Sequence, residues 1–240
     1  MNVFWLEQDA NDLPENDDWL SSAELLVLGK LIFPKRHEDW RLGRWTAKRA
    51  LAAHLGFSSD ASVLSHIEVL AAPSGAPEAF IKGRSGDFCI SLSHRERSAI
   101  CFVAPHGVRL GCDLEIIEPR SKQFIADYFN REEQDLIRRA SPADKFRFAA
   151  LLWSAKESAL KALQEGLRLD ARSITVTPDS ESCDVNGWSG LRTASGQGNA
   201  FLGWWWHRGR KVVTVVSDPA PDVPFNLADA ACHHSVLRCA

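Results

Sequence analysis

The sequence predicts an α+β fold, in which helices and strands are grouped along the chain instead of alternating strictly. Residues 35–56 have the apolar period of a long helix, and Gly56 is placed to end it. Residues 88–117 contain three apolar, β-prone runs separated by the short polar turns HRER and PHG, which is typical of an antiparallel meander. Beyond residue 170 the chain returns to strands.

The other elements follow from local signals. Residues 1–20 are expected to form a strand and a turn, and a helix is expected to begin near Ser22. The glycines and prolines of 72–87 indicate a loop. The remaining expected elements are helices at 121–140 and 143–164, the second ending at Gly166, a strand at 172–178, and a hairpin at 201–217 that turns at Arg208 and Gly209.

These elements are expected to fall into two halves, residues 1–107 and residues 108–220. Residues 221–240 are expected to form a loosely ordered tail, because the composition changes after Asp218. No internal repeat is evident by eye.

Bulk composition excludes several classes of protein. The chain has 240 residues, 45% of them hydrophobic, which is enough to bury a core without disulfides. A net charge of −3 gives no reason to expect binding to nucleic acid or to an anionic membrane. The six cysteines form no C-x-x-C pair, the N-terminus does not resemble a signal peptide, and no apolar run is long enough to span a bilayer. We therefore expect a cytoplasmic protein.

Two carboxylates stand close together in GCDLE, residues 111–115. Residues two apart on a strand share a face, so Asp113 and Glu115 are side by side while Cys112 and Leu114 turn toward a core. Neighbouring anions repel each other and favour a bound cation. The alternative is an ordinary solvated strand face.

The segment WSAKESALKA, residues 153–162, places Glu157 and Lys161 four apart on a helix. Such a pair is usually a surface ion pair. Together with Asp113 and Glu115, however, Glu157 completes a set of three hard oxygen ligands that suits Mg²⁺. Lys161 would point to the same region, and Trp153 is a candidate wall of the site.

Two further groups can bind an anion. Ser93 and His94 lie where a strand runs into a turn, and they either hold a phosphate or stabilise the turn. Arg41, Arg44 and Lys48 border the apolar stripe of the first long helix, where they either lean into a cleft or form a solvated basic face. The sequence contains no nucleophile elbow and no glycine-rich phosphate loop.

Taken in order, five segments resemble the 4′-phosphopantetheinyl transferases of the surfactin-synthetase type, the long single-chain class. They are GRWTAKRAL at 43–51, SLSH at 91–94, GCDLE at 111–115, FNREE at 129–133 and WSAKESALK at 153–161. The family's two hallmarks, G-x-D-x-E and then W-x-x-K-E-x-x-x-K, both occur here in that order and at the family's separation.

The resemblance implies a pseudo-twofold arrangement of two similar α+β halves, with coenzyme A bound between them. It implies transfer of the 4′-phosphopantetheine arm of coenzyme A to a serine of an acyl or peptidyl carrier protein, with release of adenosine 3′,5′-bisphosphate. The protein is expected to act as a monomer.

The resemblance also implies roles for single residues. The metal ligands would be Asp113, Glu115 and Glu157, with Mg²⁺ held against the pyrophosphate. The catalytic residues would be Asp113, Glu157 and Lys161. The contacts to coenzyme A would come from Arg44, Lys48, Ser93, His94, Lys156 and Lys161.

One departure from the family concerns the loop before the meander. The family often has a basic residue between Gly and Pro, whereas this chain has Gly75-Ala76-Pro77. Lys82 or Arg84 is a candidate to replace that contact to coenzyme A.

Carrier proteins of this kind are acidic, so a basic surface is expected beside the site. The candidates are Arg138, Arg139, Lys145 and Arg147, and the alternative is a solvated helix end. Two other functions stay open: a noncatalytic protein that binds coenzyme A or a carrier protein, and another Mg²⁺-dependent phosphotransferase.

Overall fold

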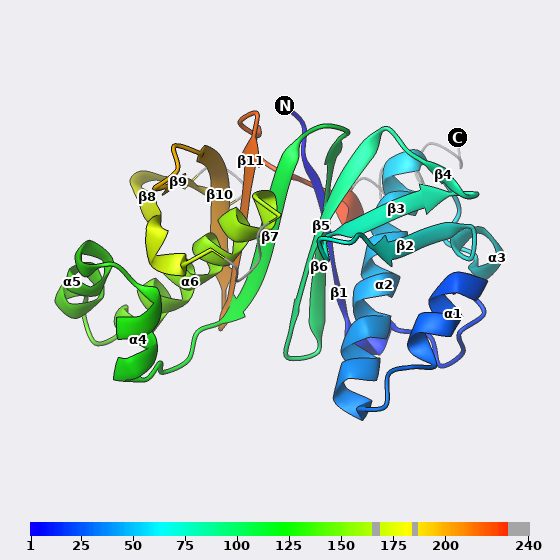
Figure 1. Cartoon of the computed structure of the whole chain (residues 1–240), viewed down its shortest axis with the longest axis horizontal. Coiled ribbons are helices and arrows are strands. Elements are labelled where there is room, and N and C mark those ends of the chain that lie inside the picture. The colour runs from blue at the N-terminus through cyan, green and yellow to red at the C-terminus, as the bar shows by residue number, and fades with distance from the viewer. Residues whose placement is uncertain (165–168, 184–186, 230–240) are drawn as a thin grey trace. The chain divides into compact units, whose positions relative to one another are not determined.

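The computed structural model describes residues 1–164, 169–183 and 187–229. The chain forms two compact units (Figure 1). The N-terminal unit comprises Asn2–Gly107 and the chain from Pro224 onward, and the C-terminal unit comprises Val108–Val223 with Met1. Each unit combines helices with mainly antiparallel sheet, so the predicted α+β class is confirmed.

The N-terminal unit packs its helices against two small sheets. Its helices are α1 (Ser22–Leu28), α2 (Pro34–Leu55) and α3 (Ala61–Leu64). Its strands are β1 (Phe4–Asp9), β2 (Ile67–Ala71), β3 (Pro77–Ile81), β4 (Arg84–Ser85), β5 (Phe88–Arg95), β6 (Ser98–Pro105) and β12 (Phe225–Asn226). One sheet has the strand order β12-β1-β6-β5 and the other the order β2-β3-β4.

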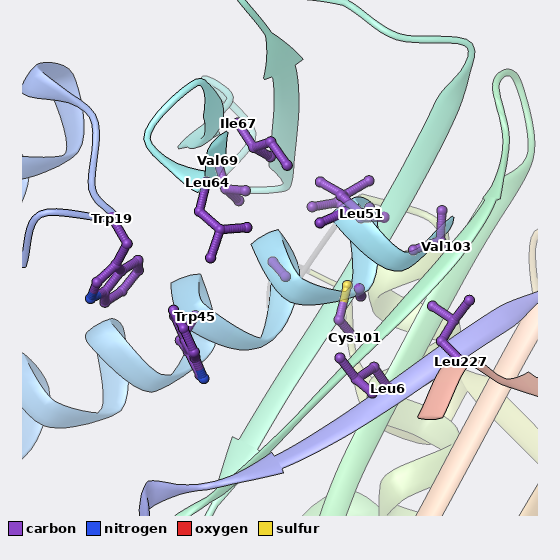
Figure 2. Close-up of a cluster of buried hydrophobic side chains, with 14 of the residues drawn as sticks. Leu6, Trp19, Trp45, Leu51, Leu64, Ile67, Val69, Cys101, Val103 and Leu227 are labelled. Atoms are coloured by element: carbon purple, nitrogen blue, oxygen red, sulfur yellow. The ribbon is translucent and has the colours of Figure 1, made fainter. Parts of the chain in front are cut away.

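Helix α2 is the centre of the core of this unit. Figure 2 shows side chains of α2 gathered with others from β1, β2 and β6. The rings of Trp45 and Trp19 meet edge to face, with centroids 5.2 Å apart. The helix ends at Gly56 as predicted, because that residue adopts φ +69°, a left-handed conformation that favours glycine.

The C-terminal unit places one long helix on a five-stranded sheet. Its helices are α4 (Lys122–Tyr128), α5 (Arg131–Arg139) and α6 (Lys145–Ala162). Its strands are β7 (Arg109–Ile116), β8 (Ile174–Cys183), β9 (Ser189–Ser195), β10 (Ala200–Arg208) and β11 (Lys211–Asp218). The strand order is β7-β11-β10-β9-β8, and α6 packs against β7 and β11.

The two units repeat one arrangement of elements. A strand, a helix pair and four strands follow one another as β1, α1–α2, β2, β3, β5, β6 in one unit and as β7, α5–α6, β8, β9, β10, β11 in the other. In both units the last of these strands pairs with the first. The expectation of two similar α+β halves is therefore confirmed. In the sequence, the trace of this repeat is the pair of segments WTAK at 45–48 and WSAK at 153–156.

A buried ion pair marks the same place in each repeat. Lys48 of α2 lies 2.5 Å from Glu24 of α1, and both side chains are fully buried. Lys156 of α6 lies 2.8 Å from Glu133 of α5, with side-chain exposures of 0% and 4%. Each glutamate also closes a capping box at the start of its own helix. The pair thus fastens the two helices of each unit together.

The structure differs from the predicted elements at several points. The third run of the expected meander, β7, pairs with β11 and not with β6, since it belongs to the second unit. The expected loop at 72–87 contains the short strands β3 and β4. The helix expected at 121–140 is divided into α4 and α5, because Asn130 caps a new helix.

The expected tail begins with ordered backbone: β12 pairs in parallel with β1. The expected helix end at Gly166 lies outside the described residues. The predicted hairpin of β10 and β11 is confirmed, with Gly209 at φ +56° in the turn. None of the described helices is long and apolar enough to cross a membrane.

Candidate active site

Strand β7 carries two carboxylates on the face that meets α6. Asp113 and Glu115 are 5% and 9% exposed, so they do not form a solvated strand face. Cys112 and Leu114 on the opposite face are buried in the core, as the alternation of a strand predicts. Burial of two neighbouring acidic side chains is costly unless cations compensate their charge.

Gly111 explains how closely helix and strand approach each other. A Cβ atom at this position would collide with the backbone carbonyl oxygen of Ser158 and the backbone nitrogen of Ala162, both on α6. Only glycine therefore permits this contact. Since residues two apart share a face, the same close approach brings Asp113 up against α6.

Lys161 of α6 reaches across to this acidic face. Its Nζ donates to Asp113 Oδ1 at 2.9 Å and to the carbonyl oxygen of Cys112 at 2.9 Å. Burial disfavours the charged ammonium and is the largest single effect, but Asp113, Cys112 and Glu157 together outweigh it, so the pKa of Lys161 lies above its ordinary value. Lys161 is thus a cation held on the strand, and its side chain remains 31% exposed.

Glu157 of α6 faces the same acidic group. Burial raises the pKa of its carboxyl, and the charges of Asp113 and then Glu115 raise it further, while Lys161 lowers it. Three carboxylates from one strand and one helix therefore share an electrostatic neighbourhood. Glu157 and Lys161 are not the solvated surface pair that a helix spacing of four usually indicates.

Arg120 is a member of the site that the sequence did not reveal. Its guanidinium nitrogen lies 2.8 Å from Glu115 Oε2, a second one lies 3.0 Å from Glu118, and the group sits 5.0 Å from the ring centroid of Phe124. The available signal was a basic residue soon after the D-x-E pair and directly after Pro119. Arg120 compensates the charge of Glu115 as Lys161 compensates that of Asp113.

The three carboxylates suit a hard divalent cation by their chemistry. Nevertheless, within the described part of the chain no three or more His, Cys, Asp or Glu side chains stand in an arrangement that could hold a metal ion. Lys161 and Arg120 instead occupy positions beside Asp113 and Glu115. A cation held at this place would draw on the carboxylates of Asp113, Glu115 and Glu157.

Two lysines predicted to contact coenzyme A have a structural role instead. Lys48 donates to the carbonyl oxygens of Trp19 and Leu64, and Lys156 donates to those of Ala171 and Ile174. With their glutamate partners they fill buried positions in the two repeats, so neither side chain can reach a ligand. The structure therefore gives no support to the predicted contacts of Lys48 and Lys156 to coenzyme A, because each ammonium is bound by a buried glutamate.

Trp153 does not wall the site. Its ring packs edge to face on Phe124 and Tyr128 of α4, with centroids 5.1 and 4.8 Å away. It corresponds to Trp45 in the other repeat, which also packs on an aromatic ring. The tryptophan of this motif therefore belongs to the core.

The remaining candidates for anion binding lie in the N-terminal unit. Arg44 of α2 is half-buried, with its guanidinium 4.7 Å from the ring centroid of Trp40, and burial lowers its pKa. His94 at the end of β5 is exposed, and its Nδ1 lies 4.0 Å from Asp39 Oδ2. Ser93 precedes it on the same strand. Each of these side chains lies at or near the surface of its unit.

The expected basic surface consists of partly compensated charges. Arg138 pairs with Asp135 at 2.5 Å and Arg147 pairs with Asp144 at 2.7 Å, each three residues apart on the chain. Arg139 and Lys145 are exposed. Lys82 and Arg84, the suggested substitutes near Gly75-Ala76-Pro77, are exposed at the turn between β3 and β4.

Comparison with known proteins finds similarity to 4′-phosphopantetheinyl transferases. Residues 109–194 match the model of the 4′-phosphopantetheinyl transferase superfamily. The 4′-phosphopantetheinyl transferase HetI of Nostoc sp. (strain PCC 7120) is 26% identical over 176 residues, covering 72% of this chain and 72% of that protein. The chain is therefore similar to 4′-phosphopantetheinyl transferases over much of its length.

Holo-[acyl-carrier-protein] synthases are similar to this chain over shorter stretches. A holo-[acyl-carrier-protein] synthase of Streptococcus agalactiae is 33% identical over 75 residues, which covers 31% of this chain and 63% of that protein. A solved holo-(acyl-carrier-protein) synthase of Bacillus anthracis, in complex with CoA (3′,5′-ADP), is 22% identical with a TM-score of 0.37, covering 42% of this chain and 92% of that chain. The synthase of Thermotoga maritima is 19% identical with a TM-score of 0.34, covering 54% and 74%.

The superfamily match coincides with the acidic site. The matched residues 109–194 include all four side chains that meet between β7 and α6, namely Asp113, Glu115, Glu157 and Lys161. They include neither Arg44 nor His94. The part of the chain that is similar to the superfamily is therefore the part that concentrates the charged groups.

Proposed function

We propose that this protein transfers the 4′-phosphopantetheine arm of coenzyme A to a serine of an apo acyl or peptidyl carrier protein and releases adenosine 3′,5′-bisphosphate. The observation that carries the proposal is the meeting of Asp113 and Glu115 of β7 with Glu157 and Lys161 of α6 inside the matched segment. The proposed type is the long single-chain one, since two repeats of the fold stand within one chain.

The proposed reaction forms one bond between the serine oxygen and the β-phosphorus of coenzyme A and breaks the bond to the leaving phosphate. Negative charge grows on the phosphoryl oxygens, and Lys161 supplies a fixed ammonium to stabilise it. Held against Asp113, this ammonium needs little reorganisation during the reaction.

Glu157 is the proposed acceptor of the serine proton. A general base works best when its pKa is near the working pH, and burial beside two other carboxylates raises the pKa of Glu157 in that direction. The proton moves from the serine oxygen to the Glu157 carboxylate as the phosphorus–oxygen bond forms. Lys161, one turn further on, remains protonated throughout.

Magnesium is part of the proposal as a cofactor, with Asp113, Glu115 and Glu157 as its ligands. When bound, Mg²⁺ would neutralise charge on the pyrophosphate. Support comes from the chemistry of the three carboxylates and from the charge that they accumulate at one place.

The proposed contacts to coenzyme A outside this site are Arg44, Ser93 and His94, with the 3′-phosphate meeting the last two. Their support is the positive charge of Arg44, the exposed imidazole and the motif order of the sequence. An acidic carrier protein is proposed to approach Arg139 and Lys145, whose charges face solvent.

The experiment is an intact-mass assay with a panel of apo carrier proteins, coenzyme A and Mg²⁺. The expected result is a carrier that gains one phosphopantetheine arm while adenosine 3′,5′-bisphosphate accumulates. Binding of coenzyme A or carrier without any mass gain would establish a noncatalytic protein. Inert coenzyme A with consumption of nucleoside triphosphate would establish a different phosphotransferase.

A further inference from the structure

The buried pair of Glu133 and Lys156 joins three elements next to the acidic site. Glu133 accepts hydrogen bonds from the backbone of Asn130 at 3.0 Å and of Val176 at 3.2 Å, so it ties the start of α5 to β8. Lys156 Nζ lies 2.8 Å from Glu133 Oε2 and donates to the carbonyl oxygens of Ala171 and Ile174. The middle of α6 is thereby fixed to α5 and to the chain leading into β8.

A second set of polar contacts holds the opposite side of α6. Ser154 Oγ and Ser158 Oγ lie 2.9 and 2.7 Å from Thr214 Oγ1 of β11. At 3.6 residues per turn, Lys156 projects roughly 160° away from these two serines around the helix. If only the serine contacts held α6, the helix could rotate about its own axis. Contacts on both sides of the helix fix that rotation.

Glu157 and Lys161 project from the arc of the helix beside the serines. Glu157 directly follows Lys156, so it projects roughly 100° from it around the axis. Any roll of α6 that follows loss of the Lys156 anchor therefore changes the approach of both side chains to Asp113. A helix of about 5 Å radius converts a roll of roughly 10° into a shift of about 1 Å at the side chains.

We propose that Glu133 is a positioning residue for the transfer reaction: through Lys156 it sets the rotation of α6 and so the placement of Lys161 and Glu157 against Asp113. The geometric part of this inference stands on the contacts alone, and its consequence for turnover rests on the proposed function.

The other repeat offers a matched control. Glu24 accepts from the backbone of Ser21 at 2.9 Å and of Val69 at 2.9 Å, and it pairs with the buried Lys48, so its contacts copy those of Glu133. The residues of α2 that correspond to Glu157 and Lys161 are Arg49 and Ala53. Glu24→Gln thus breaks the same kind of anchor in the unit that lacks Asp113 and its partners.

The first measurement reads the geometry without any substrate. A carbodiimide couples a carboxylate to an amine in direct contact, so the 2.9 Å pair of Lys161 and Asp113 is a substrate for it, and peptide mass spectrometry quantifies the cross-link. Glu133→Gln is expected to lower the yield several-fold, whereas Glu24→Gln leaves it as in the wild type. Equal yields in all three proteins would overturn the inference, whatever the outcome of the transferase assay.

The second measurement separates positioning from simple stability. At a temperature where circular dichroism finds all variants folded, Glu133→Gln is expected to lower kcat for transfer roughly 10- to 100-fold with KM for coenzyme A changed less than threefold. Glu24→Gln should leave kcat within twofold, with any change falling on KM for coenzyme A, since α2 also carries Arg44. A kcat loss of the same size in both variants would show that the anchors act only through stability.

A double variant covers the case in which Glu133→Gln fails to fold. Glu133→Gln with Lys156→Met removes the buried charge together with its partner, which avoids an unpaired ammonium. Because the anchor is still lost, the Asp113–Lys161 cross-link should fall as in the single variant. A wild-type yield in the folded double variant would refute the positioning role. If the wild type transfers nothing, the proposed function fails, and the cross-link result is unaffected.

Discussion

Replacing Gly111 by alanine tests whether close contact between β7 and α6 creates the acidic site. The added Cβ would meet the backbone of Ser158 and Ala162 well inside the 3.4–4 Å of ordinary contact. Backbone atoms of a packed helix cannot move singly, so α6 has to retreat by roughly 1 Å or more. Overpacking of this kind costs about 1–3 kcal/mol of unfolding free energy.

The same shift should be more damaging to activity than to stability. A misplacement of about 1 Å in catalytic groups lowers turnover on the order of 100-fold, and here it would separate Lys161 and Glu157 from Asp113. The assays are urea unfolding and the mass-gain assay on the folded fraction. The cross-link between Asp113 and Lys161 should be lost as well.

Gly43 of α2 provides a control in which the same substitution should raise the unfolding free energy instead of lowering it. A Cβ atom there would have no neighbour within 4 Å, and the residue lies inside a helix. Gly43→Ala should therefore stabilise the protein by about 0.5–1 kcal/mol through helix propensity alone. The reasoning would be refuted if Gly111→Ala proved as stable as the wild type with an intact Asp113–Lys161 cross-link.

Three further predictions concern single side chains. The raised pKa of Glu157 means that the folded protein binds this proton more tightly than the unfolded chain, a stabilisation present below the unfolded pKa and lost as pH rises through the folded pKa. Glu157→Gln, which mimics the protonated form, should then be more stable than the wild type at about pH 8 with chelator present. This gain in unfolding free energy should vanish near pH 4, about the ordinary pKa of glutamate. Urea titrations at both pH values check the prediction, and an equal gain at both would contradict it. Asp113→Ala and Glu157→Ala should each abolish transfer while the circular dichroism spectrum stays native, and turnover by both variants would disprove the assignment of these carboxylates. His94→Ala should raise KM for coenzyme A more than it lowers kcat in steady-state kinetics, and an unchanged KM would remove His94 from the 3′-phosphate.

Local signals predicted the elements that local rules control. Gly56 ends α2, and the β10–β11 hairpin turns where glycine follows arginine, because backbone conformation at a glycine depends on few neighbours. The partner of β7 could not be predicted in this way. In sequence, β7 looks like the third strand of a meander. Its actual partner is β11, which lies about 100 residues further along the chain, so local signals do not reveal the pairing.

The site could be predicted as a set of residue types, but not as a set of contacts. The motif spacing identified Asp113, Glu115, Glu157 and Lys161, and the structure brings them together. Arg120 could not be predicted, because it belongs to no periodic pattern and reaches Glu115 from beyond the end of β7.

The structural roles of Lys48 and Lys156 become clear when α2 is compared with α6. In sequence, a lysine at helical spacing looks the same whether it faces solvent or a buried glutamate. The internal repeat separates the two cases. The lysine of WTAK and the lysine of WSAK are both fully buried and paired with a glutamate. This is expected if the fold itself requires the pair.

Energetics distinguishes the functional charges from the structural ones. Glu133 and Lys156 satisfy each other and the surrounding backbone groups, so the fold itself accounts for both. Glu157 is different: burial beside Asp113 and Glu115 makes its charge unfavourable, and Lys161 compensates only part of that effect. Residues 49 and 53 of the other repeat build the same fold without these charges. The surroundings of Glu157 thus disfavour its charged form, and the other repeat has no carboxylate at the equivalent position, Arg49. Catalysis is therefore a better explanation of Glu157 than a role in the fold.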